Sequence, residues 1–452
     1  MIGEGVQPND VDTLRGVQIS VIGCGYLGAT HAAGMAELGH EVVGVEYDAA
    51  KLAALRDGKV TFYEPGLPEL IGKHVDTGLL RFTAEMKDAA DVADVHFLCV
   101  GTPQLPESIG ADLQYLEAAI DTLAPLLTRP CLVVGKSTVP VGTAARLAAR
   151  LAELAPAGSE ARLAWNPEFL REGFALEDTL RPDRLVFGTT EEGPLATLRS
   201  VYAVALAAGT PEIVTDLETA ELVKVAANAF LATKISFINA MAEICEVVGA
   251  DVVQLADAIG HDARIGRKFL NAGIGFGGGC LPKDIRAFQH RAAELGVEDA
   301  TAFLRDIDSV NQRRRQQMVE NALAAVEGHP QSRITVLGAA FKPQSDDVRD
   351  SPALWIAGEL HRRGHHVVVH DPRAIPTARQ RFPDLTYILD LEEALTGADL
   401  VLHLTEWQEY RRLDPVCARA LVRSPQLIDG RNVLDIDAWR AAGWSVRSMG
   451  RP

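Results

Sequence analysis

Short apolar runs alternate with longer amphipathic stretches over the first half of the chain. The runs lie at 17–22, 41–45, 94–100, 131–135 and 162–164, and segments with helical periodicity separate them. The same alternation resumes with apolar runs at 333–337, 367–370, 400–404 and 426–428. Apolar strands that alternate with helices are typical of parallel sheets covered on both faces. The pattern therefore predicts two α/β units, near residues 15–215 and 325–452.

A long helical pattern separates the two units. Residues 216–248 contain no proline and many strong helix formers, so we expect one long helix, with Lys224 and Asn228 four apart on one face. Such a helix would be a natural dimer surface. A second helical stretch near 300–326 carries Arg313–Arg315, which we interpret as a solvated helix face.

Composition and charge narrow the class of protein. The 452 residues are 47% hydrophobic and 23% charged, and the net charge of −17 argues against a general nucleic-acid or anionic-membrane surface. The six cysteines form no Cys-x-x-Cys pair, which indicates neither a zinc site nor a disulfide framework. No run reaches 18 uncharged apolar residues, and the first seventeen residues lack the apolar core of a secretion signal. We therefore expect a cytoplasmic protein without a membrane span.

The first predicted strand leads directly into Gly23-x-Gly25-x-x-Gly28 and a helical run, and the second ends in Glu46. These glycines permit a tight turn and let a pyrophosphate approach the helix N-terminus. A carboxylate at Glu46 would accept hydrogen bonds from a ribose diol and would repel a 2′-phosphate. The pattern predicts a dinucleotide site that prefers NAD to NADP; the alternative is merely a tight turn.

A glycine-rich stretch at 273–279 leads into Cys280, and Asp284 follows. Five glycines in seven positions allow positive φ and a close approach to a ligand. A helix that begins by Leu281 would place free N–H groups at Cys280 and favour its thiolate, with Asp284 one turn further on. The pattern indicates a nucleophile, although an isolated cysteine is more often a buried structural one.

Polar loops follow the other predicted strands of the first unit, at 101–103, 136–142 and 166–173. Ligands collect at the carboxyl ends of strands in a parallel sheet, so we expect cofactor and substrate to meet there. Glu168 and Glu172 are four apart, which is often just a solvated helix face, but their place at a strand end makes at least one a site candidate. Lys224 could equally be a surface lysine.

Motifs along nearly the whole chain resemble those of the UDP-glucose/GDP-mannose 6-dehydrogenase family. They are Gly23–Gly28, Phe62–Gly66, Gly101–Pro103, Lys136–Pro140, Asn166–Gly173, Glu221–Lys224 with Ala227–Phe230, Gly275–Asp284, Ala340–Lys342 with Asp347–Pro352, and Asp429–Arg431. The resemblance implies an α/β fold of two Rossmann-like doubly wound domains joined by a long central helix and a helical middle domain. It implies an NAD-binding domain at 1–215, a central dimerisation region with the cysteine loop at 216–324, and a UDP-sugar-binding domain at 325–452.

The resemblance also implies a four-electron oxidation of the sugar C6 alcohol of UDP-glucose to a carboxylate, with two NAD⁺ used in succession. An aldehyde lacks the tetrahedral carbon from which a second hydride can leave. Attack by a thiolate supplies that carbon as a thiohemiacetal, whose oxidation gives a thioester that water cleaves.

Three sets of site residues follow from the resemblance. In the catalytic set, Cys280 is the nucleophile and Lys224 stabilises the oxyanion. Glu168 is the base for thioester hydrolysis, and Thr138 and Asp284 hold or activate a water. Asn228 positions the sugar or the oxyanion. The cofactor set is Gly23, Gly25, Gly28, Glu46, Lys51, Thr102, Thr138, Glu172, Lys283 and Arg349. The substrate set is Glu168, Phe169, Leu170, Lys224, Asn228, Arg264, Phe269, Gly277, Phe341, Lys342 and Arg431, with Arg264 reaching a neighbouring subunit. The resemblance implies no metal, and it leaves open which group takes the first proton.

The chain departs from the family pattern in three places. Gly279 stands where many members have Ser, Leu281 where many have Phe, and Asn271 where the animal enzymes have Lys. Three alternatives stay open: GDP-mannose as the substrate of the same mechanism, a single-hydride hydroxyacid dehydrogenase in which Cys280 is structural, and a binding protein without catalysis.

Overall fold

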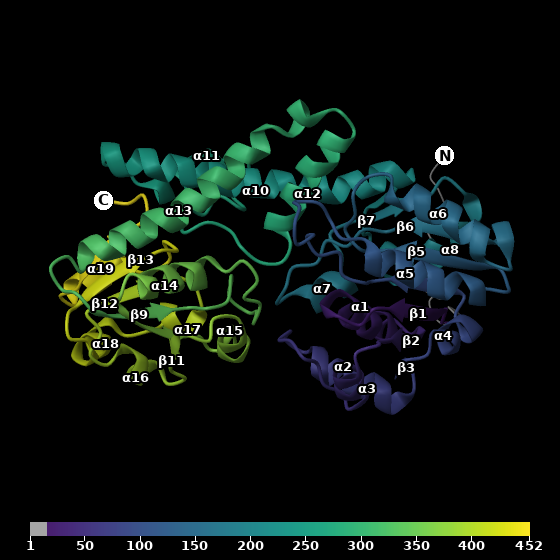
Figure 1. Cartoon of the computed structure of the whole chain (residues 1–452), viewed down its shortest axis with the longest axis horizontal. Coiled ribbons are helices and arrows are strands. Elements are labelled where there is room, and N and C mark those ends of the chain that lie inside the picture. Colours follow the sequence, from purple (N-terminus) through teal and green to yellow (C-terminus); the bar gives the residue numbers. More distant parts are fainter. Residues whose placement is uncertain (1–15) are drawn as a thin grey trace, which may run out of the picture. The chain divides into compact units, whose positions relative to one another are not determined.

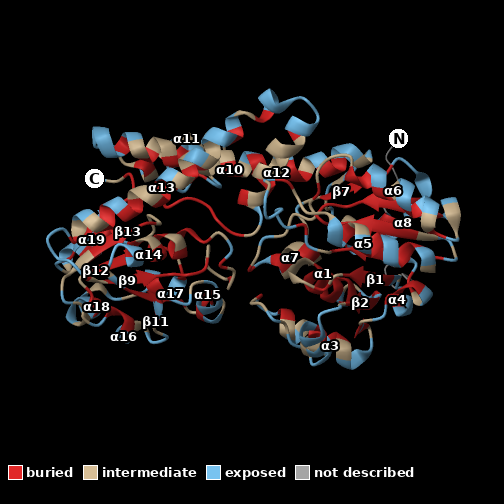
Figure 2. Cartoon of the chain, in the orientation of Figure 1, coloured by how far each residue is buried: buried red, intermediate tan, exposed pale blue. Residues whose placement is uncertain are grey.

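The computed structural model describes residues 16–452, so the expectation about the first seventeen residues falls almost entirely outside the described residues. The chain divides into two compact units (Figure 1). Unit 1 runs to Leu105 and from Ala111 to Lys224, and unit 2 comprises Pro106–Gly110 and Val225–Pro452. Each unit has a sheet whose strands are mostly buried (Figure 2).

Unit 1 contains an eight-stranded sheet in the order β3-β2-β1-β4-β5-β6-β7-β8. Its strands are β1 (Gln18–Ile22), β2 (Glu41–Val45), β3 (Leu80–Thr83), β4 (Val95–Leu98), β5 (Cys131–Gly135), β6 (Ala161–Trp165), β7 (Leu185–Gly188) and β8 (Glu212–Thr215). All neighbours are parallel except β6 and β7. The order reverses between β1 and β4, which is the doubly wound arrangement whose ligands bind at the reversal.

Apolar side chains of these strands enter two separate cores. On β4, Val95 and Phe97 belong to one cluster and Leu98 to the other, because successive side chains point to opposite faces. The covering helices are α1 (Tyr26–Glu37), α2 (Ala49–Arg56), α3 (Leu67–Thr77), α4 (Met86–Val92), α5 (Gln114–Leu123), α6 (Thr143–Leu154), α7 (Ala175–Leu180), α8 (Glu192–Val201) and α9 (Ala203–Ala207). Burial on both faces explains why the sequence shows continuous apolar runs.

Unit 2 contains a six-stranded parallel sheet in the order β11-β10-β9-β12-β13-β14. Its strands are β9 (Arg333–Leu337), β10 (His366–His370), β11 (Thr386–Tyr387), β12 (Leu400–His403), β13 (Gln426–Asp429) and β14 (Ser445–Ser448). The helices after β9 are α14 (Pro352–Arg362), α15 (Ile375–Arg381), α16 (Leu391–Leu395), α17 (Gln408–Arg411), α18 (Pro415–Leu421) and α19 (Ile436–Ala441). This is again the doubly wound order, so the predicted fold class is confirmed.

Helices precede the second sheet: α10 (Leu217–Val248), α11 (Val252–Gly260), α12 (Leu281–Glu294) and α13 (Phe303–Ala325). Among residues 16–452, α10 is the one helix that is long and apolar enough to cross a membrane, by length and composition alone. Its apolar window is 44% buried, and a buried core helix of a soluble protein has the same properties. The finding is therefore weak evidence for a membrane span.

The interpretation of Arg313–Arg315 as a solvated face is wrong for two of the three residues. Arg314 is fully buried and Arg315 is 2% exposed, whereas Arg313 is exposed and pairs with Glu243 at 3.5 Å. Arg314 pairs with Glu246 and Arg315 with Asp350. Residues one position apart point in different directions from a helix, so adjacent arginines meet different surroundings.

Candidate active site

The turn between β1 and α1 has the backbone that a dinucleotide site needs. Gly23 has a φ of 87°, and a Cβ at Gly28 would collide with the carbonyl oxygen of Gly23. Gly25 is the N-cap of α1 and has no side-chain cap, and a Cβ there would meet nothing within 4 Å. Glu46 follows β2 and accepts the N–H of Asp48 at 2.9 Å. The open helix N-terminus and this carboxylate fit the pyrophosphate and the ribose of NAD.

Side-chain hydroxyl groups join the loops after β4 and β5 to each other's backbone carbonyls. Thr102 Oγ1 donates to the carbonyl of Thr138 at 2.7 Å, and Ser137 Oγ donates to the carbonyl of Val100 at 2.7 Å. The side chain of Thr102 therefore fixes the backbone of Thr138.

Glu221 of α10 anchors the end of the loop after β5, where α6 begins. Its carboxylate accepts the N–H groups of Gly142 and Ala144 at 2.7 and 2.6 Å, at the start of α6. Burial raises the pKa of Glu221 to about 7, although the two N–H donors oppose this shift. The segment that carries Thr138 is therefore held against the sheet and against α10.

Glu168 and Lys224 form a buried ion pair, with 2.9 Å between Oε1 and Nζ. Lys224 is 6% exposed, so it is not a surface lysine. The other carboxylate oxygen of Glu168 accepts the N–H of Leu170 at 2.6 Å. Burial alone would raise the pKa of Glu168, but the charge and hydrogen bond of Lys224 and the Leu170 N–H outweigh it and hold the pKa below its ordinary value. Lys224 Nζ also lies 5.6 Å from the ring centre of Phe169.

Lys136 is a further buried cation of unit 1. Its Nζ lies 2.9 Å from Asn166 Oδ1 and 3.2 Å from the hydroxyl of Tyr202, and Asn166 Nδ2 donates to the carbonyl of Val186 at 2.9 Å. Burial lowers the pKa of Lys136 to about 8. Lys136, Asn166, Tyr202 and Glu168 line one pocket. The motifs contain Lys136 and Asn166, but nothing in the sequence signals Tyr202.

Glu64 is another residue whose role the sequence does not reveal, although it lies in a family motif. It is 2% exposed and accepts the N–H groups of Gly173 and Ala175 at 2.6 and 2.8 Å. It therefore fixes the end of the loop that carries Glu168 and Glu172.

In unit 2, Cys280 is exposed and is the N-cap of α12, which confirms the predicted helix start at Leu281. The N–H of Asp284 donates to the carbonyl of Cys280 at 3.0 Å. Asp284 is 2% exposed and accepts Asn228 Nδ2 at 2.6 Å and Lys283 Nζ at 2.6 Å. The structure thus joins Asn228, Lys283 and Asp284 beside the first turn that follows the cysteine.

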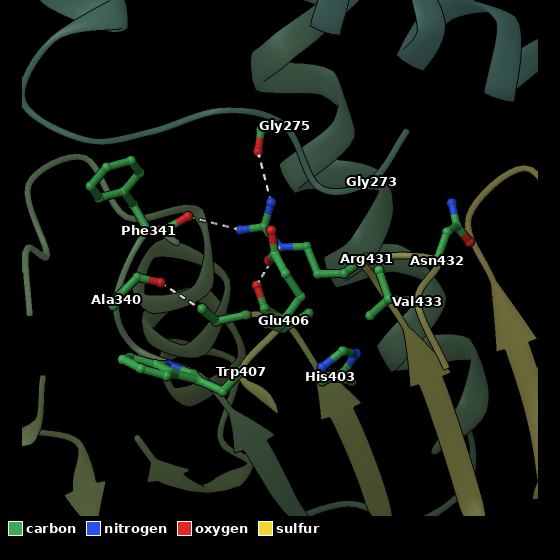
Figure 3. A network of polar contacts seen from close by, with 12 residues as sticks. Gly273, Gly275, Ala340, Phe341, His403, Glu406, Trp407, Arg431, Asn432 and Val433 are labelled. Carbon is green, nitrogen blue, oxygen red and sulfur yellow. Dashed lines mark hydrogen bonds and ion pairs between the residues drawn. The ribbon is translucent and has the colours of Figure 1, made fainter. Parts of the chain in front are cut away.

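Arg431 lies in a network of backbone carbonyls (Figure 3). Its guanidinium donates to Leu404 at 2.6 Å, to Phe341 at 3.1 Å and to Gly275 at 3.4 Å, and it pairs with Glu406 at 3.3 Å. The arginine predicted to grip a diphosphate thus also links the end of β12, the loop after β9 and the cysteine loop.

The remaining substrate and cofactor candidates of unit 2 are Gly277, Phe341, Lys342, Arg349, Arg264 and Phe269. Lys342 Nζ lies 5.4 Å from the ring centre of Phe341, a Cβ at Gly278 would come within 2.8 Å of that ring, and one at Gly277 would collide with the carbonyl of Asp350. Arg349 pairs with Asp347 at 2.7 Å. Arg264 pairs only locally, with Asp262, and Phe269 is exposed with a φ of 64°. In unit 1, Lys51 is exposed and Glu172 is half-buried.

The catalytic candidates divide between the units. Thr138, Glu168 and Lys224 belong to unit 1, and Asn228, Cys280 and Asp284 belong to unit 2. Lys224 and Asn228 are four residues apart on α10, which crosses the boundary between the units. Among residues 16–452, no group of three or more His, Cys, Asp or Glu side chains could hold a metal ion.

Three family models cover most of the chain. Residues 17–206 match the NAD binding domain of the UDP-glucose/GDP-mannose dehydrogenase family, 218–313 its central domain, and 335–436 its UDP binding domain. The chain belongs to this family. The resemblance seen in the sequence is therefore confirmed, and so are a dehydrogenase activity and NAD as the cofactor.

Individual relatives agree with the family models. The chain is 41% identical over 437 residues to the UDP-glucose 6-dehydrogenase TuaD of Bacillus subtilis, covering 96% of this chain and 93% of that protein. It is 40% identical over 439 residues to the UDP-glucose 6-dehydrogenase of Rhizobium meliloti, covering 96% and 100%. The solved structure of a UDP-glucose dehydrogenase from Pyrobaculum islandicum superimposes with a TM-score of 0.90 at 38% identity, covering 99% and 100% of the two chains.

Proposed function

We propose that this protein oxidises UDP-glucose to UDP-glucuronate, consuming two NAD⁺ and one water per sugar. The observation that carries the proposal is the buried Glu168–Lys224 pair, a carboxylate held ionised against an ammonium. The relatives named as UDP-glucose 6-dehydrogenases support UDP-glucose as the substrate.

The proposed mechanism assigns roles to side chains of this chain, apart from the base that takes the C6 hydroxyl proton in the first oxidation. NAD⁺, held by Gly23, Gly25, Gly28 and Glu46, would supply the hydride acceptor for each oxidation at C6. Lys224 stabilises the negative charge that develops on the substrate oxygen, which a buried cation does well in a low-dielectric site. Cys280 adds through Sγ to the C6 aldehyde and forms a thiohemiacetal, which the second oxidation converts to a thioester. Glu168 takes a proton from the water that cleaves this thioester, and the thiolate leaves.

The other residues position these groups. Asn228 and Lys283 hold the Asp284 carboxylate. Asp284 and Thr138 hold or activate the water. Gly23, Gly25, Gly28 and Glu46 bind NAD, and Phe341, Lys342 and Arg431 bind the nucleotide sugar.

The domain and assembly predictions belong to the same proposal. Residues 1–215 bind NAD, residues 216–324 carry the dimer interface and the cysteine, and residues 325–452 bind the UDP-sugar. Exposed apolar side chains recur along one face of α10 at Phe230, Phe237, Ile244 and Val248, which supports a homodimer through this helix. We also propose that the protein is cytoplasmic and binds neither a membrane nor nucleic acid.

The test is the stoichiometry of turnover. Purified protein given UDP-glucose and NAD⁺ is expected to form two NADH for each sugar consumed, whereas one NADH per sugar, or none, would overturn the proposal. A parallel assay with GDP-mannose distinguishes the second candidate substrate.

Substitution of the nucleophile tests the mechanism. Cys280→Ser should abolish uronate formation, because a serine hydroxyl is a far weaker nucleophile than a thiolate. A single-hydride hydroxyacid dehydrogenase would keep most of its activity in this variant. The exposed Cys417 supplies the control Cys417→Ser, which should retain full activity.

A further inference from the structure

The glycine-rich segment before Cys280 is buried and held by side chains, although its composition suggests a mobile loop. Residues 272–278 are all buried. The N–H of Gly273 donates to Asn239 Oδ1 at 2.8 Å. Asn311 accepts the N–H of Phe276 at 2.7 Å and donates to its carbonyl at 3.0 Å. Side chains from α10 and α13 thus satisfy the backbone of this segment.

Three arginines each donate to a different carbonyl of the segment. Arg314 Nε lies 3.3 Å from the oxygen of Gly273, Arg431 Nη1 lies 3.4 Å from that of Gly275, and Arg315 Nη2 lies 2.8 Å from that of Phe276. The Arg315 contact is the shortest of the three, and Arg315 is 2% exposed. A hydrogen bond from a charged donor is about twice as strong as one between neutral groups.

Arg315 also binds a second segment of unit 2. Its Nη1 donates to Asp350 Oδ1 at 2.7 Å, and its Nη2 lies 3.5 Å from the Asp350 carbonyl. Asp350 has a φ of 45°, a conformation that costs energy for a residue with a side chain and persists only where contacts fix it. The backbone carbonyl of its neighbour Arg349 accepts the N–H of Gly278 at 2.9 Å. One guanidinium therefore joins the cysteine segment to the segment that carries Arg349.

We propose that Arg315 is a positioning residue that fixes the backbone leading to Cys280. Only Gly277, Gly278 and Gly279 separate Phe276 from the cysteine. Three consecutive glycines have more conformational freedom than any other tripeptide, so the thiol is placed only if the chain is fixed just before them. Arg315 supplies this anchor at the Phe276 carbonyl, and through Asp350 it ties the glycines to the neighbouring segment. The inference rests on the proposed function, in which Cys280 is the nucleophile.

The experiment compares a double variant at Arg315 and Asp350 with a single variant at Arg313. Arg315→Met combined with Asp350→Asn removes the anchor without leaving the half-buried carboxylate of Asp350 unpaired, which would itself be destabilising. Arg313→Met is the matched control, since Arg313 is the same residue type on the same helix but is exposed and pairs with Glu243. Hydrogen exchange of residues 274–279 is measured on the ligand-free proteins. Alkylation by iodoacetamide is followed by peptide mass spectrometry at Cys280, with the exposed Cys417 as the internal reference.

In the double variant, exchange at 274–279 should be about tenfold faster, while β9 and β12 keep their protection. The alkylation rate of Cys280 relative to Cys417 should change, and the Arg313→Met control should match the parent protein. With UDP-glucose and NAD⁺, kcat should fall about 100-fold with little change in KM, because the reacting thiol is misplaced while the substrate still binds. Unchanged exchange at 274–279, or equally faster exchange in β9 and β12, would overturn the inference.

A second variant keeps the test decisive if the double variant does not fold. Arg315→Lys retains a cation beside Asp350 but lacks the forked guanidinium that reaches both partners, so the same local loss of protection is expected. Exchange and alkylation need no substrate. If the parent protein does not turn over UDP-glucose, the proposed function fails while these two measurements still decide the role of Arg315.

Discussion

Two buried lysines act on Glu168. Lys224 does so through the 2.9 Å ion pair, and Lys136 acts by its charge from the pocket that it lines together with Glu168. A carboxylate in a buried site needs such cations to stay ionised, because burial favours its neutral form. The ionised state of Glu168, the base proposed for thioester hydrolysis, thus depends in part on the charge of Lys136.

Replacing Lys136 tests this dependence. Lys136→Met removes one cation near Glu168, so the acid limb of the kcat–pH profile should move to higher pH. Tyr202→Phe is the control: it removes another hydrogen-bond donor to Asn166 but keeps the charge, so it should leave the acid limb in place. If both variants shift the limb equally, Lys136 acts by holding Asn166 rather than by its charge.

A substitution in the turn after β1 can test NAD binding without a large change in the stability of the fold. A Cβ at Gly25 would point into open space, and Gly25 has a φ of −69°, which alanine adopts without strain. Gly25→Ala should therefore weaken NADH binding about tenfold or more, by blocking the approach of the pyrophosphate, with little change in Tm. Fluorescence titration with NADH and thermal unfolding measure the two effects. Gly72→Ala is the control, since its Cβ is also unobstructed but lies in α3, and it should leave NADH binding unchanged.

At the scale of elements, Glu221 links the N-terminus of α6 to α10. Because burial raises its pKa to about 7, the folded protein binds this proton more tightly than the unfolded chain does. The resulting stability is fully present below the ordinary carboxyl pKa, and it is lost as the pH rises through about 7.

Glu221→Gln mimics the protonated side chain, so it should remove this pH dependence. The Tm of the variant relative to the parent protein should be higher at pH 8 than at pH 5. Glu218→Gln, one turn earlier on α10 and exposed, removes only a negative charge that adds to the rise of the Glu221 pKa, so it should show the same change to a smaller degree. A Tm difference that is the same at both pH values would contradict the assignment.

The sequence predicts most of the elements that bury apolar residues continuously, but it misses β7, a strand of four residues that are all buried. The long α10 and strands such as β1, β5 and β9 lie where the apolar runs place them. β8 was not predicted, because it lies at the edge of its sheet and its residues are exposed or half-buried. β11 has only two residues. Edge and very short strands carry too little apolar pattern to be recognised.

The candidate site, like the fold, could be predicted from the sequence only in part. Motifs pointed to Cys280, Lys224 and Glu168, because the chemistry requires those residue types. They did not reveal that Arg315 is buried, because its partners Phe276 and Asp350 lie 39 and 35 residues away. A run of three arginines carries no local sign of which ones face the interior. Partners distant in sequence thus decide what each charged side chain does.

At the scale of the whole molecule, the exposed face of α10 determines the expected assembly. Phe230 is 67% exposed, Phe237 47% and Ile244 54%, at intervals of seven residues that place them on one side of the helix. Contiguous exposed apolar side chains on a long helix are typical of an interface. A second copy of α10 against this face would remove them from water.

Phe237→Glu should therefore convert the proposed dimer to a monomer, because it places a charge in the centre of the apolar face, where burial without a partner is costly. Sedimentation velocity measures the mass, and Val416→Glu is the control, since Val416 is 65% exposed on α18 and should leave the dimer intact. A parent protein that sediments as a monomer would refute the interface. A Phe237→Glu variant that remains dimeric would place the contact on another face of the protein.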